Sequence, residues 1–215
     1  MAPNDEAIPI PLAEPISLQE GKQVTTIDLS QTAEFIQPPT TVEIQVIRDT
    51  YRSLVSRRAS DGINEVIPNG ISDHASILYE QFFLNARENV RIYCKDLSNE
   101  VFGTDFVVNA ASKALEKKVR IDVIIQDERP KNNKFSQLFR KGSNFSDLLS
   151  ISRACDGFEN SSMNFSAMDC IAYRIEPNRE EIKASANMCD PVTAVEVVKL
   201  FDDLKNNSSQ PLTLT

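Results

Sequence analysis

Residues 161–176 read SSMNFSAMDCIAYRIE, and the pattern of these residues is the most informative about the fold. Apolar and aromatic side chains run on both sides of Asp169 and Cys170. Two such runs joined by a tight turn predict an antiparallel hairpin. The later segment Pro191 to Leu204 has proline in its first turn and an apolar stripe, features that predict a helix. The stripe consists of Ala194, Val197, Val198, Phe201 and Leu204.

Upstream of the hairpin, the sequence alternates between helical and extended patterns. The β-branched run VRIDVIIQD, residues 119–127, predicts a central strand, and NVRIYC, residues 89–94, a shorter one. Helices are predicted before each strand, the first after a turn at residues 68–70 and the second over residues 102–117. Residues 145–154 also have a helical pattern. The order helix, strand, helix, strand predicts an α/β domain with a parallel strand pair.

The order of these elements and the residues in them resemble the phospholipase D-like fold over residues 72–204. That family's signature is His-x-Lys-(x)4-Asp, followed by Gly-Ser-x-Asn on the next strand and then by a helix. The matching stretches here are SMNFSAMD, residues 162–169, and ASAN, residues 184–187, followed by the helix that carries Phe201. The resemblance implies a phospholipase D-like single half, with a mixed sheet flanked by helices and an extended N-terminal arm.

The resemblance also implies a degenerate site. Ser162 stands where the nucleophilic His would be, Asn164 stands where the phosphate-binding Lys would be, and Asp169 keeps the Asp. Ser185 and Asn187 match the later Ser and Asn. A serine without a neighbouring base is a poor nucleophile, and an amide brings no positive charge to a phosphoryl transition state. We therefore expect no catalytic residues and no enzymatic activity.

The remaining candidate site residues have simpler interpretations. The single histidine, His74, lies in the first turn of the first predicted helix, where we interpret it as a cap or surface contact. The four cysteines are Cys94, Cys155, Cys170 and Cys189, with no Cys-x-x-Cys pair among them. We expect them to be buried, reduced thiols, and we expect neither a metal site nor a cofactor.

A basic cluster follows the central strand. It consists of Arg129, Lys131, Lys134, Arg140 and Lys141, with Phe135 and Phe139 between them. One interpretation is a loop that contacts phosphates and stacks on a single strand of nucleic acid. The alternative is a solvated loop whose two phenylalanines form an apolar ridge on the domain.

Residues 1–47 are interpreted as a proline-rich, acidic arm with short strands at residues 24–29 and 42–47. Residues 1–40 hold six of the eleven prolines, and their six acids and one lysine give −5 of the total charge of −8. The arm is either disordered or docks on a partner or a second copy. Residues 48–70 are expected to form a basic amphipathic helix, over residues 50–59, and a connector. The resemblance implies a phospholipase D-like domain over residues 71–204, and residues 205–215 are expected to form a polar tail.

We expect a cytoplasmic protein without membrane contact, because the sequence has neither an apolar stretch of about 18 residues nor a signal-peptide pattern. The sequence favours a non-catalytic binding or assembly subunit that joins a protein partner, or a second copy in a homodimer, through its N-terminal arm. The alternative is a nucleic-acid-binding subunit of a nuclease-type complex that uses residues 129–141. A third interpretation is a phosphodiesterase with a different mechanism.

Overall fold

The computed structural model describes residues 40–140, 143–181 and 183–214 of the 215-residue chain. Residues Pro39–Thr215 form one compact unit. The predictions made for residues 1–39, including the strand at residues 24–29, and for Lys141 lie outside the described residues.

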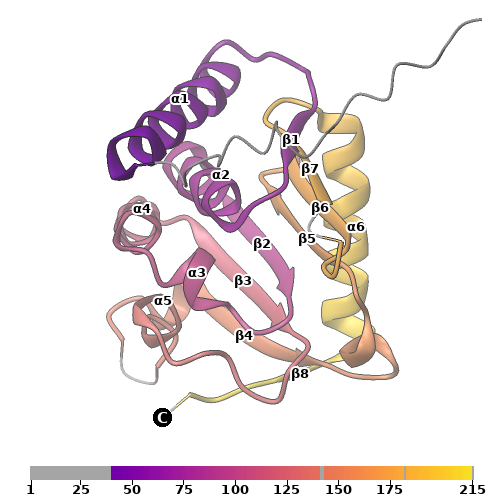
Figure 1. Ribbon diagram of the computed structural model, residues 1–215. Helices are drawn as coiled ribbons and strands as arrows, with labels where there is room; N and C mark the ends of the chain where they lie inside the picture. The colour runs from indigo at the N-terminus through magenta and orange to yellow at the C-terminus, as the bar shows by residue number, and fades with distance from the viewer. Residues whose placement is uncertain (1–39, 141–142, 182, 215) are drawn as a thin grey trace, which may run out of the picture. The chain divides into compact units, whose positions relative to one another are not determined.

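The described residues form a mixed sheet in the order β1-β7-β6-β5-β2-β3-β4-β8 (Figure 1). Strands β2, β3 and β4 are parallel to one another, and the other neighbouring strands pair antiparallel. The strands are β1 Ile67–Asn69, β2 Asn89–Cys94, β3 Arg120–Ile125, β4 Leu149–Ala154, β5 Asn164–Met168, β6 Ala172–Asn178, β7 Lys183–Asn187 and β8 Ser209–Pro211.

Helices cover both faces of the sheet (Figure 1). Helices α1, α2, α4 and α5 lie on one side, where they share the larger hydrophobic core with the sheet. Helix α6 lies on the other side and packs its predicted apolar stripe against Tyr93, Phe165 and Tyr173. The helices are α1 Thr41–Ser60, α2 Ser72–Asn85, α3 Asn99–Phe102, α4 Asp105–Glu116, α5 Lys134–Gln137 and α6 Pro191–Asn207.

The structure confirms the predicted α/β fold class, the parallel strand pair and the hairpin. Strands β2 and β3 form the expected parallel pair, and β5 and β6 form the expected hairpin. Asp169 and Cys170, in the hairpin turn, have φ angles of 55° and 72°. Two consecutive left-handed residues match the right-handed twist of the flanking strands, which explains why this turn is tight.

The predicted strand at residues 42–47 is wrong, because these residues belong to α1. Thr40 and Glu43 form a reciprocal capping box that starts the helix, and Tyr51 and Val55 bury its inner face. Val42 and Val46 are 72% and 59% exposed, so their alternation reflects no burial on a sheet. The predicted helix over residues 50–59 is confirmed as the second half of α1.

Three other local predictions are wrong for a shared reason, which is strand pairing between distant segments. Residues 149–154 form β4 and pair with β3, and only residues 146–148 form a short 3-10 turn of the predicted helix. The supposed turn at residues 68–70 overlaps β1, which pairs with β7. The supposed tail continues α6 to Asn207 and then forms β8 against β4. Each segment satisfies backbone groups that an unpaired sheet edge would leave without partners.

The cysteines only partly follow the prediction. All four are free thiols, and Cys94 is buried, but Cys170 is exposed because it lies in the hairpin turn. Within the described ranges, no three His, Cys, Asp or Glu side chains gather in a way that suits a metal ion. None of the described helices combines the length and apolar character needed to cross a membrane.

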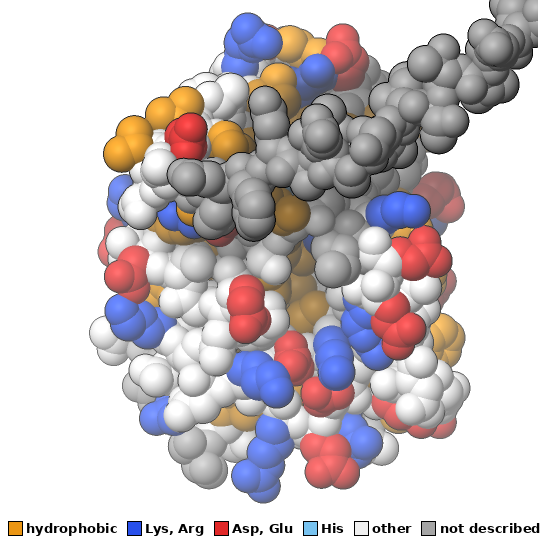
Figure 2. Space-filling model, viewed as in Figure 1, with side chains coloured by type: hydrophobic (Ala, Val, Ile, Leu, Met, Phe, Trp, Pro, Cys, Tyr) orange, Lys and Arg blue, Asp and Glu red, His pale blue; other side chains and the backbone are white. Residues whose placement is uncertain are grey.

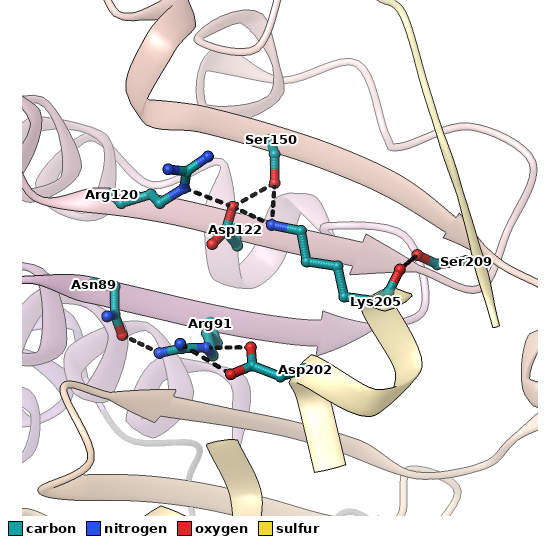
Figure 3. A network of polar contacts seen from close by, with 8 residues as sticks. All are labelled: Asn89, Arg91, Arg120, Asp122, Ser150, Asp202, Lys205 and Ser209. Carbon is teal, nitrogen blue, oxygen red and sulfur yellow. Dashed lines mark hydrogen bonds and ion pairs between the residues drawn. The ribbon is translucent and has the colours of Figure 1, made fainter. Parts of the chain in front are cut away.

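A polar network joins α6 to the sheet (Figure 3). The buried carboxylate of Asp122 accepts hydrogen bonds from Ser150 and, at 2.8 Å, from Lys205 of α6. Nearby, Arg91 of β2 contacts both carboxylate oxygens of Asp202, at 2.8 and 3.2 Å. Burial opposes ionisation of Asp122, but the hydrogen bonds from Lys205 and Ser150 outweigh it and lower the pKa of Asp122. The charged form of Asp122 therefore stabilises the docking of α6.

Replacement of Asp122 by Asn should reduce stability at neutral pH and flatten its dependence on acid. Because the folded-state pKa of Asp122 is lowered, its contribution is present above the unfolded value of about 4 and is lost as pH falls through the lower folded value. We expect Asp122→Asn to lower the free energy of unfolding by about 1–3 kcal/mol at pH 7. The difference should shrink below about pH 4. Urea denaturation across this range is the measurement, and a constant difference at all pH values would contradict the assignment.

Candidate functional site

The five residues matched to the family signature do not lie on one face of the sheet. Asn164 of β5 pairs with Glu176 of β6, and side chains of directly paired residues lie on the same face. Ser185 pairs with Ile175, and Asn187 with Tyr173. Ile175 and Tyr173 pack in the core beneath α6, whereas Asn164 and Glu176 line a pocket beside α2. The structure therefore brings Asn164 together with Glu176 and separates it from Ser185 and Asn187.

Three of the matched residues make contacts that hold the chain together. The Asp169 carboxylate accepts hydrogen bonds from the backbone N–H groups of Arg87, Glu88 and Asn89, at 2.6, 3.0 and 2.7 Å. This contact fastens the hairpin turn to the start of β2. The Asn187 side chain donates to Asn64 at 2.7 Å, which ties β7 to the segment after α1. Ser162 is exposed, and its carbonyl oxygen accepts a hydrogen bond from the Arg179 backbone at 3.0 Å.

A pocket of about 320 Å³ lies between α2, the segment after β2 and the open end of the hairpin. At its base, Arg174 is only 5% exposed. Its guanidinium donates to Asn69 at 3.0 Å and contacts the Glu176 carboxylate at 3.3 Å. Asn164 donates to the same carboxylate at 2.8 Å. A buried charge needs such partners, so these residues form one connected network.

Three buried polar atoms in or beside this network have no hydrogen-bond partner among the described residues: Asn69 Nδ2, Asn164 Oδ1 and Ser166 Oγ. Asn69 and Asn164 line the pocket, and Ser166 lies on the same face of the sheet, paired with Arg174. A buried polar atom without a partner costs about 1–3 kcal/mol. The network thus presents both donors and acceptors that a polar ligand in the pocket would satisfy.

Arg179 supplies positive charge at the pocket. Its guanidinium donates to the Gln126 side chain at 2.5 Å and to the Ser161 carbonyl oxygen at 2.6 Å, which are both neutral acceptors. No carboxylate pairs with Arg179 in the parts of the chain that the structure describes. The pocket therefore keeps an uncompensated guanidinium, next to the residue that replaces the signature histidine. Guanidinium groups suit the planar, bidentate recognition of phosphate and carboxylate groups.

The protonation states in the pocket favour binding over proton transfer. Burial raises the pKa of the Tyr79 hydroxyl to about 12 and that of the Cys94 thiol to about 12. Both groups are therefore protonated at neutral pH, and Cys94 is not a thiolate nucleophile. His74, the single histidine of the chain, is not among the pocket-lining residues and stacks on Tyr51 of α1 with ring centroids 3.7 Å apart.

The sequence interpretation missed Arg174 and Arg179, although a signal was present for one of them. Arg174 interrupts the apolar run of β6, and a charged residue in a buried strand needs a nearby partner. Arg179 lies in the segment between β6 and β7, where its position gives no indication that it faces a pocket.

The basic cluster is only partly available for binding. Lys131 contacts Asp96 at 3.4 Å, and Lys134 contacts Asp105 at 2.6 Å. Phe135 and Phe139 are buried, as the apolar-ridge interpretation predicts, so neither ring can stack on a base. Arg129 and Arg140 line a separate groove. Figure 2 shows that Lys and Arg side chains alternate with Asp and Glu side chains over the lower part of the molecule, where the parallel strands end.

No protein-family model matches the chain, and no curated protein sequence matches it. Similarity appears among solved structures. The phospholipase D family member Nuc from Salmonella typhimurium is 14% identical, with a TM-score of 0.50 over 71% of this chain and 100% of Nuc. NucT from Helicobacter pylori is 11% identical over 68% of this chain and 97% of its own, with a TM-score of 0.48. The archaeal chromatin protein TrmBL2, described as having a novel mode of DNA binding, is 12% identical over 78% of this chain and 64% of its own, with a TM-score of 0.45.

The match to Nuc extends over the whole of Nuc. The mixed sheet and its flanking helices also have the arrangement that the hairpin and the last helix predicted from the sequence. The described part of this chain has the phospholipase D-like fold.

Proposed function

We propose that this phospholipase D-like domain binds a small anionic ligand without catalysing a reaction on it, as a binding or assembly subunit. The observation that carries the proposal is the network around Asn164. At the position of the signature lysine, an amide holds the Glu176 carboxylate, which also pairs with Arg174. These contacts occupy one of the two carboxylates that line the pocket, and the other, Asp96, contacts Lys131 at 3.4 Å.

Catalysis would need a nucleophile and a group that moves a proton. Ser162 is exposed, and no hydrogen bond joins its hydroxyl to a base within the described residues. Tyr79 and Cys94 hold their protons at neutral pH. The guanidinium groups of Arg174 and Arg179 and the amides of Asn69 and Asn164 line the pocket, and such groups suit the binding of an anionic group.

The pocket also limits the kind of ligand. Its volume of about 320 Å³ is at the lower end of the range for small-molecule sites. Arg179 favours an anionic group, while Asn69 Nδ2 and Asn164 Oδ1 suit a neighbouring group that both accepts and donates hydrogen bonds. A small phosphorylated or carboxylated molecule has this combination.

The proposal predicts binding without turnover. We expect the purified chain not to hydrolyse bis(p-nitrophenyl) phosphate, a general phosphodiester probe. Inorganic phosphate should bind in calorimetry, and Arg179→Gln should weaken that binding by about tenfold or more, the loss expected for one charge-assisted hydrogen bond. Arg87→Gln, which changes an exposed arginine outside the pocket, is the control and should leave binding unchanged.

Two results would contradict the proposal. The first is hydrolysis of the probe that Ser162→Ala abolishes, because it would show a working nucleophile. The second is phosphate binding that is absent or equally strong in the Arg179→Gln variant, because the pocket would then not be the anion site.

Assembly is the second part of the proposal. Helix α1 exposes four large apolar side chains near its start: Val42, Ile44, Val46 and Ile47. Exposed apolar side chains gathered on one segment are typical of surfaces that contact another protein. They support a role for this end of the domain in joining a protein partner or a second copy. Light scattering on the samples used for calorimetry gives the mass of the assembly.

Nucleic-acid binding through residues 129–141 is the second candidate function. Phe135 and Phe139 are buried, and Lys131 and Lys134 are ion-paired, so these four described residues of the loop offer neither an exposed ring nor a free ammonium group. The observation in its favour is that Arg129 and Arg140 line an open groove. This candidate function would therefore depend on contacts with phosphate groups and not on base stacking.

A further inference from the structure

The groove that contains Arg129 and Arg140 is distinct from the pocket beside the hairpin. It has a volume of about 690 Å³ and lies between the loop after β3 and the C-terminal residues 210–214. A third arginine, Arg153 of β4, also lines it, and Glu128 is the one acid among its described lining residues. Three guanidinium groups against one carboxylate give the groove a net positive charge.

None of the three guanidinium groups is neutralised by a carboxylate within the described residues. Among the described side chains, the Arg140 guanidinium contacts the neutral Asn132 side chain, at 3.5 Å. The Nε atom of Arg153 is buried and has no hydrogen-bond partner among the described residues. A buried, unpartnered donor on a charged group favours an anionic acceptor nearby.

The C-terminal segment holds two of these arginines in place. Gln210 of β8 pairs with Arg153 of β4, and Leu214 forms a backbone bridge with Arg140. The Leu212 backbone donates to Ile151 at 2.9 Å, between those two contacts. One short segment therefore contacts the backbone at both arginines and forms a wall of the groove, so the groove depends on the docking of residues 209–214.

The charge of the neighbouring surface limits the length of the ligand. A second hollow, of about 480 Å³, shares Glu128, Arg129 and Arg153 with the groove but is also lined by Asp127 and Glu159. Three acids against two arginines make that hollow negative. A long polyanion that ran from the groove into this hollow would meet repulsion, whereas a compact phosphate group within the groove would not.

We propose that Arg129, Arg140 and Arg153, of which the last two are held by the C-terminal segment, form a second anion site that takes the phosphate or pyrophosphate group of a small phosphorylated ligand or of a nucleic-acid strand end. The site goes beyond the pocket of the proposed function. It assigns a role to the C-terminal β-strand, β8. For the nucleic-acid-binding function, it predicts contact with a terminal phosphate and not with the backbone along a nucleic-acid strand.

Calorimetric titration of the full chain with pyrophosphate, without added metal, tests the site. We expect Arg153→Gln and Arg129→Gln each to weaken binding to this site by about tenfold or more. Arg87→Gln should leave binding unchanged. Arg129 is exposed, so its variant keeps the test valid if Arg153→Gln fails to fold. Arg179→Gln, measured in parallel, reports on the pocket beside the hairpin.

The source of the phosphate is distinguished by two single-stranded oligonucleotides of one sequence, with and without a 5′-phosphate. Binding that requires the 5′-phosphate and Arg153 identifies a strand end, and pyrophosphate binding alone identifies a small ligand; both support the groove. Pyrophosphate binding that is absent, or that is lost in Arg179→Gln but kept in Arg153→Gln and Arg129→Gln, overturns the inference and leaves the pocket proposal standing. Pyrophosphate binding that the groove variants leave unchanged, together with equal binding of both oligonucleotides, also overturns it.

Discussion

Replacement of Arg174 by alanine is expected to lower the free energy of unfolding by about 3–5 kcal/mol, the cost of removing one partner of a buried ion pair. The side chains of Arg174 and Glu176 are 6% and 13% exposed, so little solvent reaches the carboxylate that remains. The substitution also removes the hydrogen bond to Asn69. Urea denaturation at pH 7, followed by circular dichroism, is the measurement.

The matched control is the double variant Arg174→Ala with Glu176→Gln. Removing the charge of Glu176 should recover part of the lost stability, because the amide carries no unpaired charge into the pocket. Two results would show that the two groups are not energetically coupled. Either Arg174→Ala lowers the free energy of unfolding by less than about 1 kcal/mol, or the loss in the double variant equals the sum of the losses in Arg174→Ala and Glu176→Gln. The network at the base of the pocket would then not hold the site in place.

Phe135→Ala is the second substitution for which we expect a loss of about 3–5 kcal/mol, as for other large-to-small changes of buried aromatic residues. Phe135 is 0% exposed, and its ring lies 5.6 Å from that of Phe83, 5.2 Å from Phe102 and 5.7 Å from Phe139. Phe83 belongs to α2, Phe102 to α3 and Phe139 to the basic cluster of residues 129–141. Thermal or urea denaturation of the variant gives the value directly.

Two controls separate burial from a general effect of losing an aromatic ring. Phe135→Leu keeps most of the volume and should cost less than Phe135→Ala. Phe158→Ala removes a partly exposed ring and should change stability only slightly. A small loss in Phe135→Ala would mean that the ring is available at the surface. The nucleic-acid candidate would then regain a stacking residue.

The candidate site was predictable only in part. The spacing from residue 162 to Asp169 located the hairpin and placed Asn164 at its open end, where the pocket lies. It also grouped Ser185 and Asn187 with Asn164, and the strand register places them on the opposite face. A shift of one residue along a strand reverses the face, and the matched spacing does not determine the register across three strands.

Local sequence patterns determined the hairpin, the central parallel strands and the amphipathic helix α6, because each depends on the periodicity of apolar residues and on turn chemistry within a few residues. The tertiary structure alone decided which segments complete the sheet and which charges meet. Strands β1, β4 and β8 form because distant backbone groups need partners. Arg174 meets Asn69 across 105 residues of chain, and Arg153 meets the C-terminal segment, through pairings that no local pattern encodes. The pocket and the groove are products of those long-range pairings, since a buried charge or an open sheet edge is stable only where the fold supplies its partner.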